Sequence, residues 1–207
     1  MPISQDESTT DGQQVSSSSK PKSLWHNRDY MLLWSGQALS DIGGAVSELA
    51  FPLLVLAVTH SPAQAGFVAA LRALPATFFS LFAGVLVDRW DRKQVMLVCD
   101  AGRALSLASI PIAFALGHLT VWQLYITAFL EGTLMIVFTL AKTAAISQVV
   151  TPVQLTTAVA QEEFVEGTTA LFGPPLAGIL YTLGMMLPFI TDAVSYTHLT
   201  LPTILRV

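Results

Sequence analysis

The stretch "GVLVDRWDRKQ", Gly84 to Gln94, places five charged residues within six positions, between two long apolar runs. Charged residues make up only 12% of the 207-residue chain, whereas hydrophobic residues make up 53%. Soluble domains carry about 25% charged residues. The composition therefore indicates that a lipid bilayer surrounds most of the chain, and the charged stretch indicates a turn at the membrane surface.

Five apolar stretches are long enough to cross a bilayer, which takes about 20 helical residues. Within lipid each must be a helix, because its backbone polar groups have no water to bind. The predicted spans cover residues 30–59, 63–87, 94–116, 121–149 and 155–183, and a sixth begins near 188. The polar segment 1–23 cannot bury enough apolar surface to fold alone, so we expect a disordered tail before a transmembrane unit at 24–193.

Positive residues flank the predicted spans on one side only. They precede the first span and lie near the connections between spans two and three and between spans four and five. These residues are Lys20, Lys22, Arg28, Arg89, Arg92, Lys93 and Lys142. Because cytoplasmic loops carry the excess of Lys and Arg, we expect a multi-pass protein with a cytoplasmic N-terminus.

The acidic residues of the opening stretch need another explanation. Asp88 can pair with a nearby arginine, and a glycine in a spanning helix such as Gly84 lets another helix approach closely. The ordered pattern resembles the loop 2–3 signature of the major facilitator superfamily, with matches at Gly84, Leu86, Asp88, Arg89, Arg92 and Lys93. Asp91 stands where the general signature has glycine, as in the branch that includes the enterobactin exporter and multidrug efflux proteins. The resemblance implies that this loop is a conformational latch.

The resemblance implies an all-α membrane protein. The chain would be the N-terminal six-helix half of a twelve-span fold, with five full spans and the start of a sixth. In the fifth span, "GTTALFGPPLAGIL" resembles the family's antiporter motif, with matches at Gly173, Pro174 and Gly178 and departures at Thr169 and Ala177. This motif implies exchange of substrate for protons. A Gly-Pro pair also kinks a helix, so an ordinary packing helix remains the alternative.

Five ionisable residues fall near mid-membrane, where such groups are costly and usually functional. They are Asp41, Arg72, Glu131, Glu162 and Glu166. The resemblance implies that their spans line a central cavity. We expect Arg72 to pair with Asp41 or Glu131, and a static pair is the alternative to a transport role. Glu162 and Glu166 share one helix face and have no cation nearby in sequence, so we expect them to share a proton.

Other polar residues carry structural interpretations. Asp100 and Arg103 are spaced for an ion pair within one helix. Glu48 lies on nearly the same face as Asp41, close enough to the outer surface to be hydrated. His60 and His118 fall in outer loops without metal-ligand spacing, so we expect no metal site.

The C-terminal stretch "VSYTHLTLPTILRV", residues 194–207, turns polar before the sixth span is complete. It resembles translated sequencing-adapter DNA. We expect native sequence to end near Ala193, with a natural short terminus as the alternative.

Together these features predict proton-coupled efflux of a small organic molecule, of drug or siderophore type, across a bacterial inner membrane. The proton gradient would be the energy source, without a cofactor. The expected partners are the lipid bilayer, the substrate and a missing C-terminal half, without which the chain is expected to be inactive. No basic patch indicates nucleic acid. An importer on the same fold remains an alternative. A membrane-embedded enzyme finds no supporting nucleophile–base or metal motif, and no phosphate-binding loop indicates an ATP-driven pump.

Overall fold

The computed structural model describes residues 28–87, 91–149 and 152–196, and within them the side chains of residues 40–79, 91–144 and 159–196. Short connections at residues 60–61, 116–120 and 184–186 lie within this part. The helices are α1 Arg28–Thr59, α2 Pro62–Val87, α3 Arg92–Ala115, α4 Val121–Val149, α5 Pro152–Leu183 and α6 Leu187–Ser195. They confirm the predicted all-α fold and begin within three residues of the predicted positions. The expected disordered tail at 1–23 lies outside the described residues.

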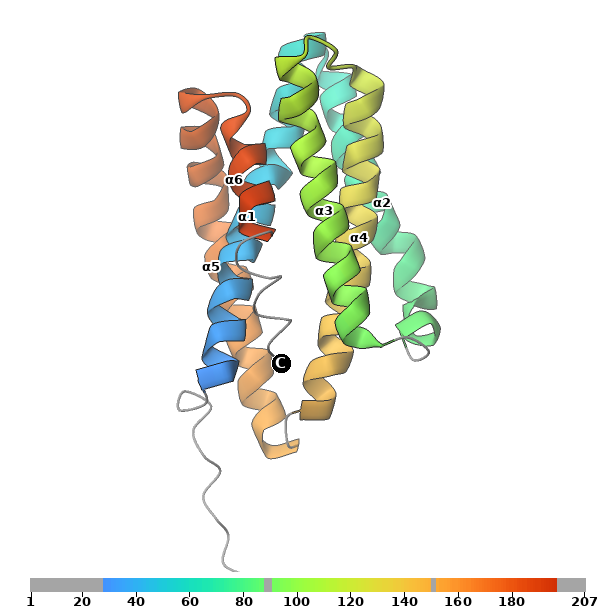
Figure 1. Cartoon of the computed structure of the whole chain (residues 1–207), viewed down its shortest axis with the longest axis vertical. Coiled ribbons are helices and arrows are strands. Elements are labelled where there is room, and N and C mark those ends of the chain that lie inside the picture. The colour runs from blue at the N-terminus through green and yellow to red at the C-terminus, as the bar shows by residue number, and fades with distance from the viewer. Residues whose placement is uncertain (1–27, 88–90, 150–151, 197–207) are drawn as a thin grey trace, which may run out of the picture.

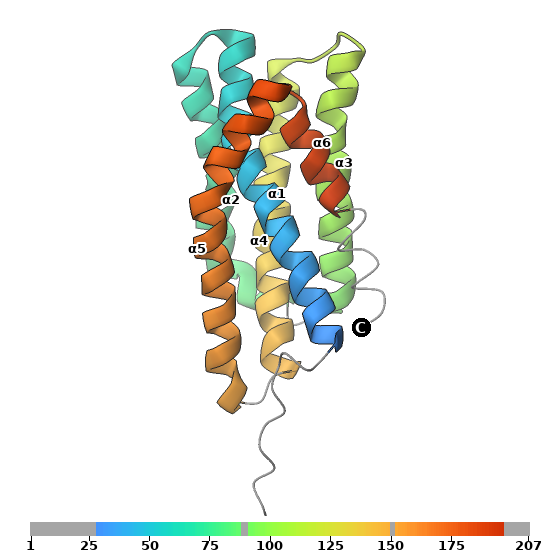
Figure 2. The same ribbon diagram turned by 90° about the vertical axis from the view of Figure 1, so that its left-hand side faces the viewer.

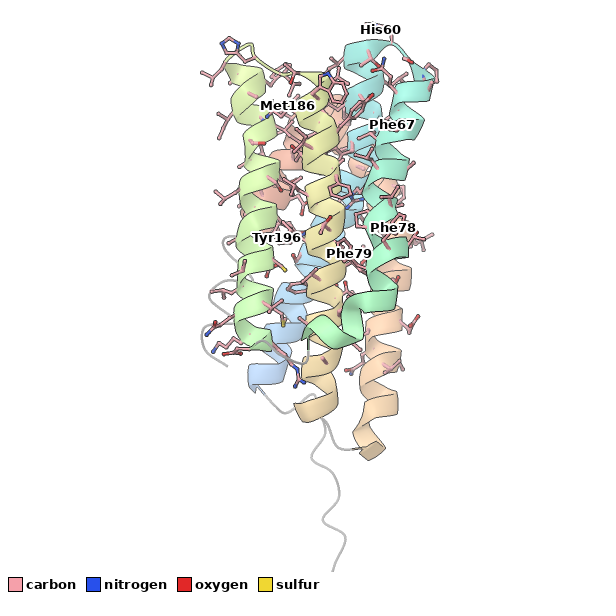
Figure 3. The ribbon with its side chains drawn as sticks, turned by 90° about the vertical axis from the view of Figure 1, so that its right-hand side faces the viewer. His60, Phe67, Phe78, Phe79, Met186 and Tyr196 are labelled. Carbon is pink, nitrogen blue, oxygen red and sulfur yellow. The ribbon has the colours of Figure 1, made fainter. Side chains whose placement is uncertain are left out.

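Three helical segments in the described part are long and apolar enough to cross a membrane: Ser40–Thr59, Arg92–Ala115 and Val121–Ala144. Large apolar side chains also cover the outside of the bundle. On α3, the exposed residues Val98, Leu105 and Ile112 are seven apart, so they form one stripe along the helix. Figure 3 shows Phe67 and Phe78 on α2, and both are more than half exposed. Such a surface suits lipid and supports a multi-pass membrane protein.

The six helices form two layers. Figure 1 shows α1, α5 and α6 on one side and α2, α3 and α4 on the other, and Figure 2 shows the first layer in front of the second. The turns α1–α2, α3–α4 and α5–α6 lie at the end drawn at the top, called the upper end here. The helix starts of α1, α3 and α5 lie at the lower end. Charged side chains from both layers meet between these ends.

Local sequence explains where α3 begins and ends. Asp91 has an extended backbone, and its carboxylate accepts a hydrogen bond of 3.1 Å from the backbone N–H of Lys93, so Asp91 caps the helix. At the other end Gly117 has a φ of +71°, and the N–H of His118 donates to the carbonyl of Ala113 at 2.9 Å. This is the Schellman arrangement, which favours glycine. Asp91, the departure from the family signature, therefore has a structural role.

Two apolar clusters fill the bundle. The upper cluster joins α1, α2, α3, α4 and α6 through Phe51, Leu54, Val68, Leu107, Leu124 and Phe189, among others. The lower one packs α3 against α4 through Met96, Cys99, Phe138 and Ala141. On α3, Arg103 lies between Cys99, which belongs to the apolar packing near the lower end, and Leu107, which belongs to the apolar packing near the upper end. A layer of buried charge is thus enclosed by apolar packing above and below.

Candidate functional site

Charged side chains gather in two groups inside the bundle. The central cluster, as we name it, consists of Glu48 on α1, Arg72 on α2, Arg103 on α3 and Glu131 on α4. The lower cluster consists of Asp41 on α1, Lys142 on α4 and Glu162 on α5. Along α1 the two groups are about 10 Å apart, because Glu48 is seven positions after Asp41 and the helix rises about 1.5 Å at each position.

The pair Arg103–Glu131 is the most completely buried part of the central cluster. The Glu131 side chain has no exposed surface, and that of Arg103 is 3% exposed. Nε of Arg103 donates to Oε1 and Oε2 of Glu131 at 3.0 and 3.2 Å, and Nη2 donates to Oε1 at 2.7 Å. Only such close, multiple bonding offsets the desolvation of two buried charges. The pair is therefore a fixed link between α3 and α4.

Arg72 is held much less tightly than Arg103. Its Nη2 is 3.8 Å from Oε1 of Glu131, and its Nη1 is 3.6 Å from Oε2 of Glu48. Its Nη2 also donates to the backbone carbonyl of Gly44 at 3.5 Å. Each of these contacts is longer than those of Arg103. Arg72 thus lies between three acceptors without a short bond to any of them.

The backbone of Arg72 is fixed even though its guanidinium is not. A Cβ atom added to Gly132 would lie 2.0 Å from the carbonyl oxygen of Arg72, so α2 and α4 touch backbone to backbone here. Only glycine permits this approach. Gly132 directly follows Glu131, which places the Arg72 and Glu131 side chains at the same level of the bundle.

The lower cluster connects three helices through one lysine. Nζ of Lys142 forms an ion pair with the Glu162 carboxylate, and it lies 4.0 Å from Oδ2 of Asp41. The side chains of Lys142, Asp41 and Glu162 are 16%, 27% and 34% exposed. One lysine thus lies beside two carboxylates at a partly exposed position.

The structure adds a partner for Glu162 that the sequence did not indicate. No cation lies near Glu162 in sequence, but Lys142 does in space. Lys142 lies 20 residues earlier, on α4, whose observed bounds are those predicted for the fourth span. Lys142 also contacts Asp41, for which Arg72 was one expected partner.

Arg103 is the functional candidate that sequence reasoning missed. It was expected to pair with Asp100, three residues earlier, and that pair stays a prediction, but its three hydrogen bonds to Glu131 on the next helix were not expected. Of the two partners expected for Arg72, the structure places Glu131 beside it. One sequence signal was available for the contact between Arg72 and Glu131. A small residue in a spanning helix marks a close helix contact, and Gly132 follows Glu131 directly.

The acidic candidate Glu166 and its neighbour Glu163 lie on exposed surface. Glu166 is exposed, one turn beyond Glu162 on α5, and Glu163 is exposed as well. The sharing of a proton between Glu162 and Glu166 stays a prediction, although the cation at Glu162 now gives that carboxylate a different partner. Glu48, interpreted as a hydrated residue, is 75% exposed at its side chain and yet contacts Arg72.

The predicted latch lies only partly within the described residues. Asp88 and Arg89 lie outside them. Gly84 lies in α2 in a part without described side chains. Arg92 and Lys93 open α3 directly after the Asp91 cap. The latch role stays a prediction.

The antiporter-like motif lies within α5, which contains Pro174 and Pro175 without ending. Figure 2 shows α5 bending toward α1 in its upper part, as expected for a helix with internal prolines. Gly173 packs closely on α1, since an added Cβ would lie 2.7 Å from the Cβ of Ala45. At Gly178 the same atom would meet open space. The motif therefore provides close packing at one of its two glycines.

The two residues after Ala193 belong to α6, which ends at Ser195, and Tyr196 is its C-cap residue. The Tyr196 ring is buried, and the guanidinium carbon of Arg103 lies 4.3 Å from its centroid. Asp192 on the same helix is buried against α1, where an added Cβ on Gly43 would lie 2.5 Å from its carboxylate. Residues 197–207 lie outside the described part. The non-native origin of residues 194–207 stays a prediction.

Two further features lie away from the clusters. A shallow hollow of about 490 Å³ opens near the upper end, lined by Ala63, Gln64, Phe67, Val121, Trp122 and Tyr125. Its contacts are mostly aromatic, with the Tyr125 hydroxyl 3.3 Å from the Gln64 side-chain oxygen. In the described ranges, no group of three His, Cys, Asp or Glu residues could hold a metal ion.

Charged clusters between membrane-length helices are typical of a transport protein. The sequence pattern of the transmembrane secretion effector family, within the major facilitator superfamily, matches residues 21–206. The chain belongs to this family. The match includes residues 194–206, and it favours a transporter over the membrane-embedded enzyme considered above.

Individual relatives agree with this membership. The chain is 29% identical over 161 residues to the MFS-type transporter YfiS of Bacillus subtilis, covering 77% of the chain and 37% of that protein. It is 28% identical over 154 residues to macrolide efflux protein A of Streptococcus pyogenes, covering 74% and 38%. It is 41% identical over 70 residues to the multidrug efflux pump Tap of Mycobacterium bovis, covering 34% and 17%. The chain thus spans little more than a third of the first two relatives.

Proposed function

We propose that this chain is the N-terminal half of a transporter that exports a small organic molecule in exchange for protons. Efflux is supported by relatives whose names describe macrolide and multidrug efflux. The chain covers 38% of macrolide efflux protein A, which is consistent with a part of a longer protein. The substrate would be of drug or siderophore type, and the relationship to the enterobactin-exporter branch belongs to the same proposal.

The lower cluster is the observation that carries proton coupling. With both carboxylates charged, Lys142 is held between Asp41 and Glu162. A proton that binds to the Glu162 carboxylate removes its charge and leaves Lys142 with Asp41 alone. Substrate entering from the cytoplasm then competes for the site, and the proton leaves as the ion pair with Lys142 forms again. One proton enters and one leaves in each cycle at this residue.

The other predicted residues complete the mechanism. Asp88, Arg89, Arg92 and Lys93 would form a latch between the two halves that favours one state of alternating access, with Gly84 permitting close helix approach. Glu166 would be a further cavity acid. The N-terminus would be cytoplasmic and the membrane the bacterial inner membrane. The proton gradient would drive transport without a cofactor.

The test is efflux by the full-length protein in inverted membrane vesicles. We expect a proton gradient to drive accumulation of a macrolide or a cationic dye, and a protonophore to abolish it. Glu162→Gln removes the proposed proton site, and we expect at least tenfold slower transport. Glu163→Gln, an exposed neighbour on the same helix, is the matched control and should transport normally. Gradient-independent transport, or equal rates in both variants, would refute the proposal.

The length of the native protein needs its own test. Sequencing the source DNA across the codon for Ala193 would show whether the frame continues. A frame that continues through a second set of spans supports the proposed half. A frame that ends at Val207 would require a partner half or self-association for transport.

A further inference from the structure

The two arginines of the central cluster differ in how they are bound. Arg103 makes three hydrogen bonds to Glu131, the shortest of 2.7 Å. The ion-pair distances of Arg72 are 3.6 Å to Glu48 and 3.8 Å to Glu131. Because Arg103 already occupies both oxygens of Glu131, the charge of that carboxylate is balanced without Arg72. Arg72 is therefore free to respond to a change at Glu48.

Glu48 is the only one of these four residues with a largely exposed side chain, at 75%. It is reached from the α2–α5 side of α1, since Arg72 lies on α2 and Gly173 of α5 packs one turn below, at Ala45. The Glu48 carboxylate is therefore accessible from the surface of the described part, whereas Glu131 is closed off. The elements packed against α1 carry these titratable or charged groups: Arg72 on α2, Tyr125, Glu131 and Lys142 on α4, Glu162, Glu163, Glu166 and Tyr181 on α5, and Asp192 on α6.

We propose that Glu48 is a second proton-binding residue, with Arg72 as a counter-ion that moves between Glu48 and Glu131. With Glu48 charged, the Arg72 guanidinium lies between the two carboxylates, as observed. A proton that binds to the Glu48 carboxylate cancels its charge, and the guanidinium moves toward Glu131. When the proton leaves, the guanidinium returns. This inference rests on the proposed function in one respect: proton-coupled transport is the process in which the proton bound at Glu48 would take part.

The contact at Gly132 limits this movement to the side chain. Because the Arg72 backbone is pressed against α4, the guanidinium can change partner by rotation of its side-chain torsions without a shift of α2. The movement alters the α1–α2 contact, since Arg72 also donates to the Gly44 carbonyl. Protonation of the exposed Glu48 thus alters the packing between α1 and α2, which belong to different layers.

The test is nuclear magnetic resonance of the full-length protein in lipid nanodiscs, with isotope-labelled arginine. The Arg72 resonance is assigned by its loss in Arg72→Lys. Between about pH 4 and pH 8, which brackets the ordinary glutamate range, we expect this resonance to move in one titration step. In Glu48→Gln, which imitates the protonated acid, it should stay at its low-pH position. Glu163→Gln, another exposed glutamate, should leave the titration unchanged.

Two results would overturn the inference. One is an Arg72 resonance that does not move with pH in the unaltered protein. The other is a titration that persists in Glu48→Gln, since another acid would then control Arg72. Neither result depends on substrate or transport. Failure of this inference is therefore distinguishable from failure of the proposed function, which the Glu162→Gln efflux assay tests.

Discussion

The central and lower clusters contain the same chemistry in different surroundings. In the central cluster, Arg103 and Glu131 are closed off from solvent and joined by three hydrogen bonds. In the lower cluster, Lys142 lies within ion-pair distance of two carboxylates, and each of these side chains is more than a quarter exposed. A buried charge that loses its partner has no water to replace it, whereas a partly exposed charge has. Removing one partner of the central pair is therefore expected to be costly, whereas the lower cluster should tolerate the loss of a partner better.

The largest effect should follow from breaking the buried pair. Glu131→Gln leaves Arg103 buried without its carboxylate, and we expect a loss of about 4 kcal/mol in the free energy of unfolding. Denaturation of the purified protein in detergent micelles measures this loss.

The double variant Arg103→Met with Glu131→Met is its control. It removes both charges and fills the space with apolar atoms, so it should recover most of the stability. A Glu131→Gln protein as stable as the unaltered one would contradict the structural role of the pair.

A smaller loss is expected from separating α2 and α4. Gly132→Ala places a Cβ against the backbone oxygen of Arg72, so the helices must move apart, at about 1–3 kcal/mol. Gly66→Ala, whose added Cβ would meet open space on α2, is the matched control. Chemical denaturation of both proteins compares them. Equal stability of the two variants would show that the close contact is not maintained.

The smallest effect on stability is expected in the lower cluster. Lys142→Gln removes an ion pair of partly exposed groups, and we expect a change of at most about 1 kcal/mol. Efflux should nevertheless fall at least tenfold, because Asp41 and Glu162 lose the cation that they share. Unfolding and vesicle transport measured on the same preparation separate the two effects. A large loss of stability would place the lower cluster with the central one as a structural element.

The helices were predictable because each depends on its own sequence. Runs of apolar residues define α1 to α5, and the charged stretch of sequence before Arg92 marks the boundary between the second helix and the third. Asp91 was recognised as a departure from the family signature, but its role as a helix cap needs the backbone angles that the structure provides.

The partners of the charged residues were only partly predictable. Depth along a helix placed Arg72 and Glu131 near mid-membrane together with Asp41, Glu162 and Glu166, because depth follows from position in a span. Which helices are neighbours does not follow from one sequence. The contacts of Arg103 with Glu131 and of Lys142 with Glu162 each join two helices, so the rule of three- and four-residue spacing within one helix could not find them.

The most direct test of the central claim is the number of protons released when substrate binds to the purified full-length protein. In weakly buffered solution, a pH indicator measures this release. We predict that the unaltered protein and Glu163→Gln release the same number of protons, and that Glu162→Gln releases fewer. Equal release from all three proteins would contradict the claim that the lower cluster exchanges a proton for substrate.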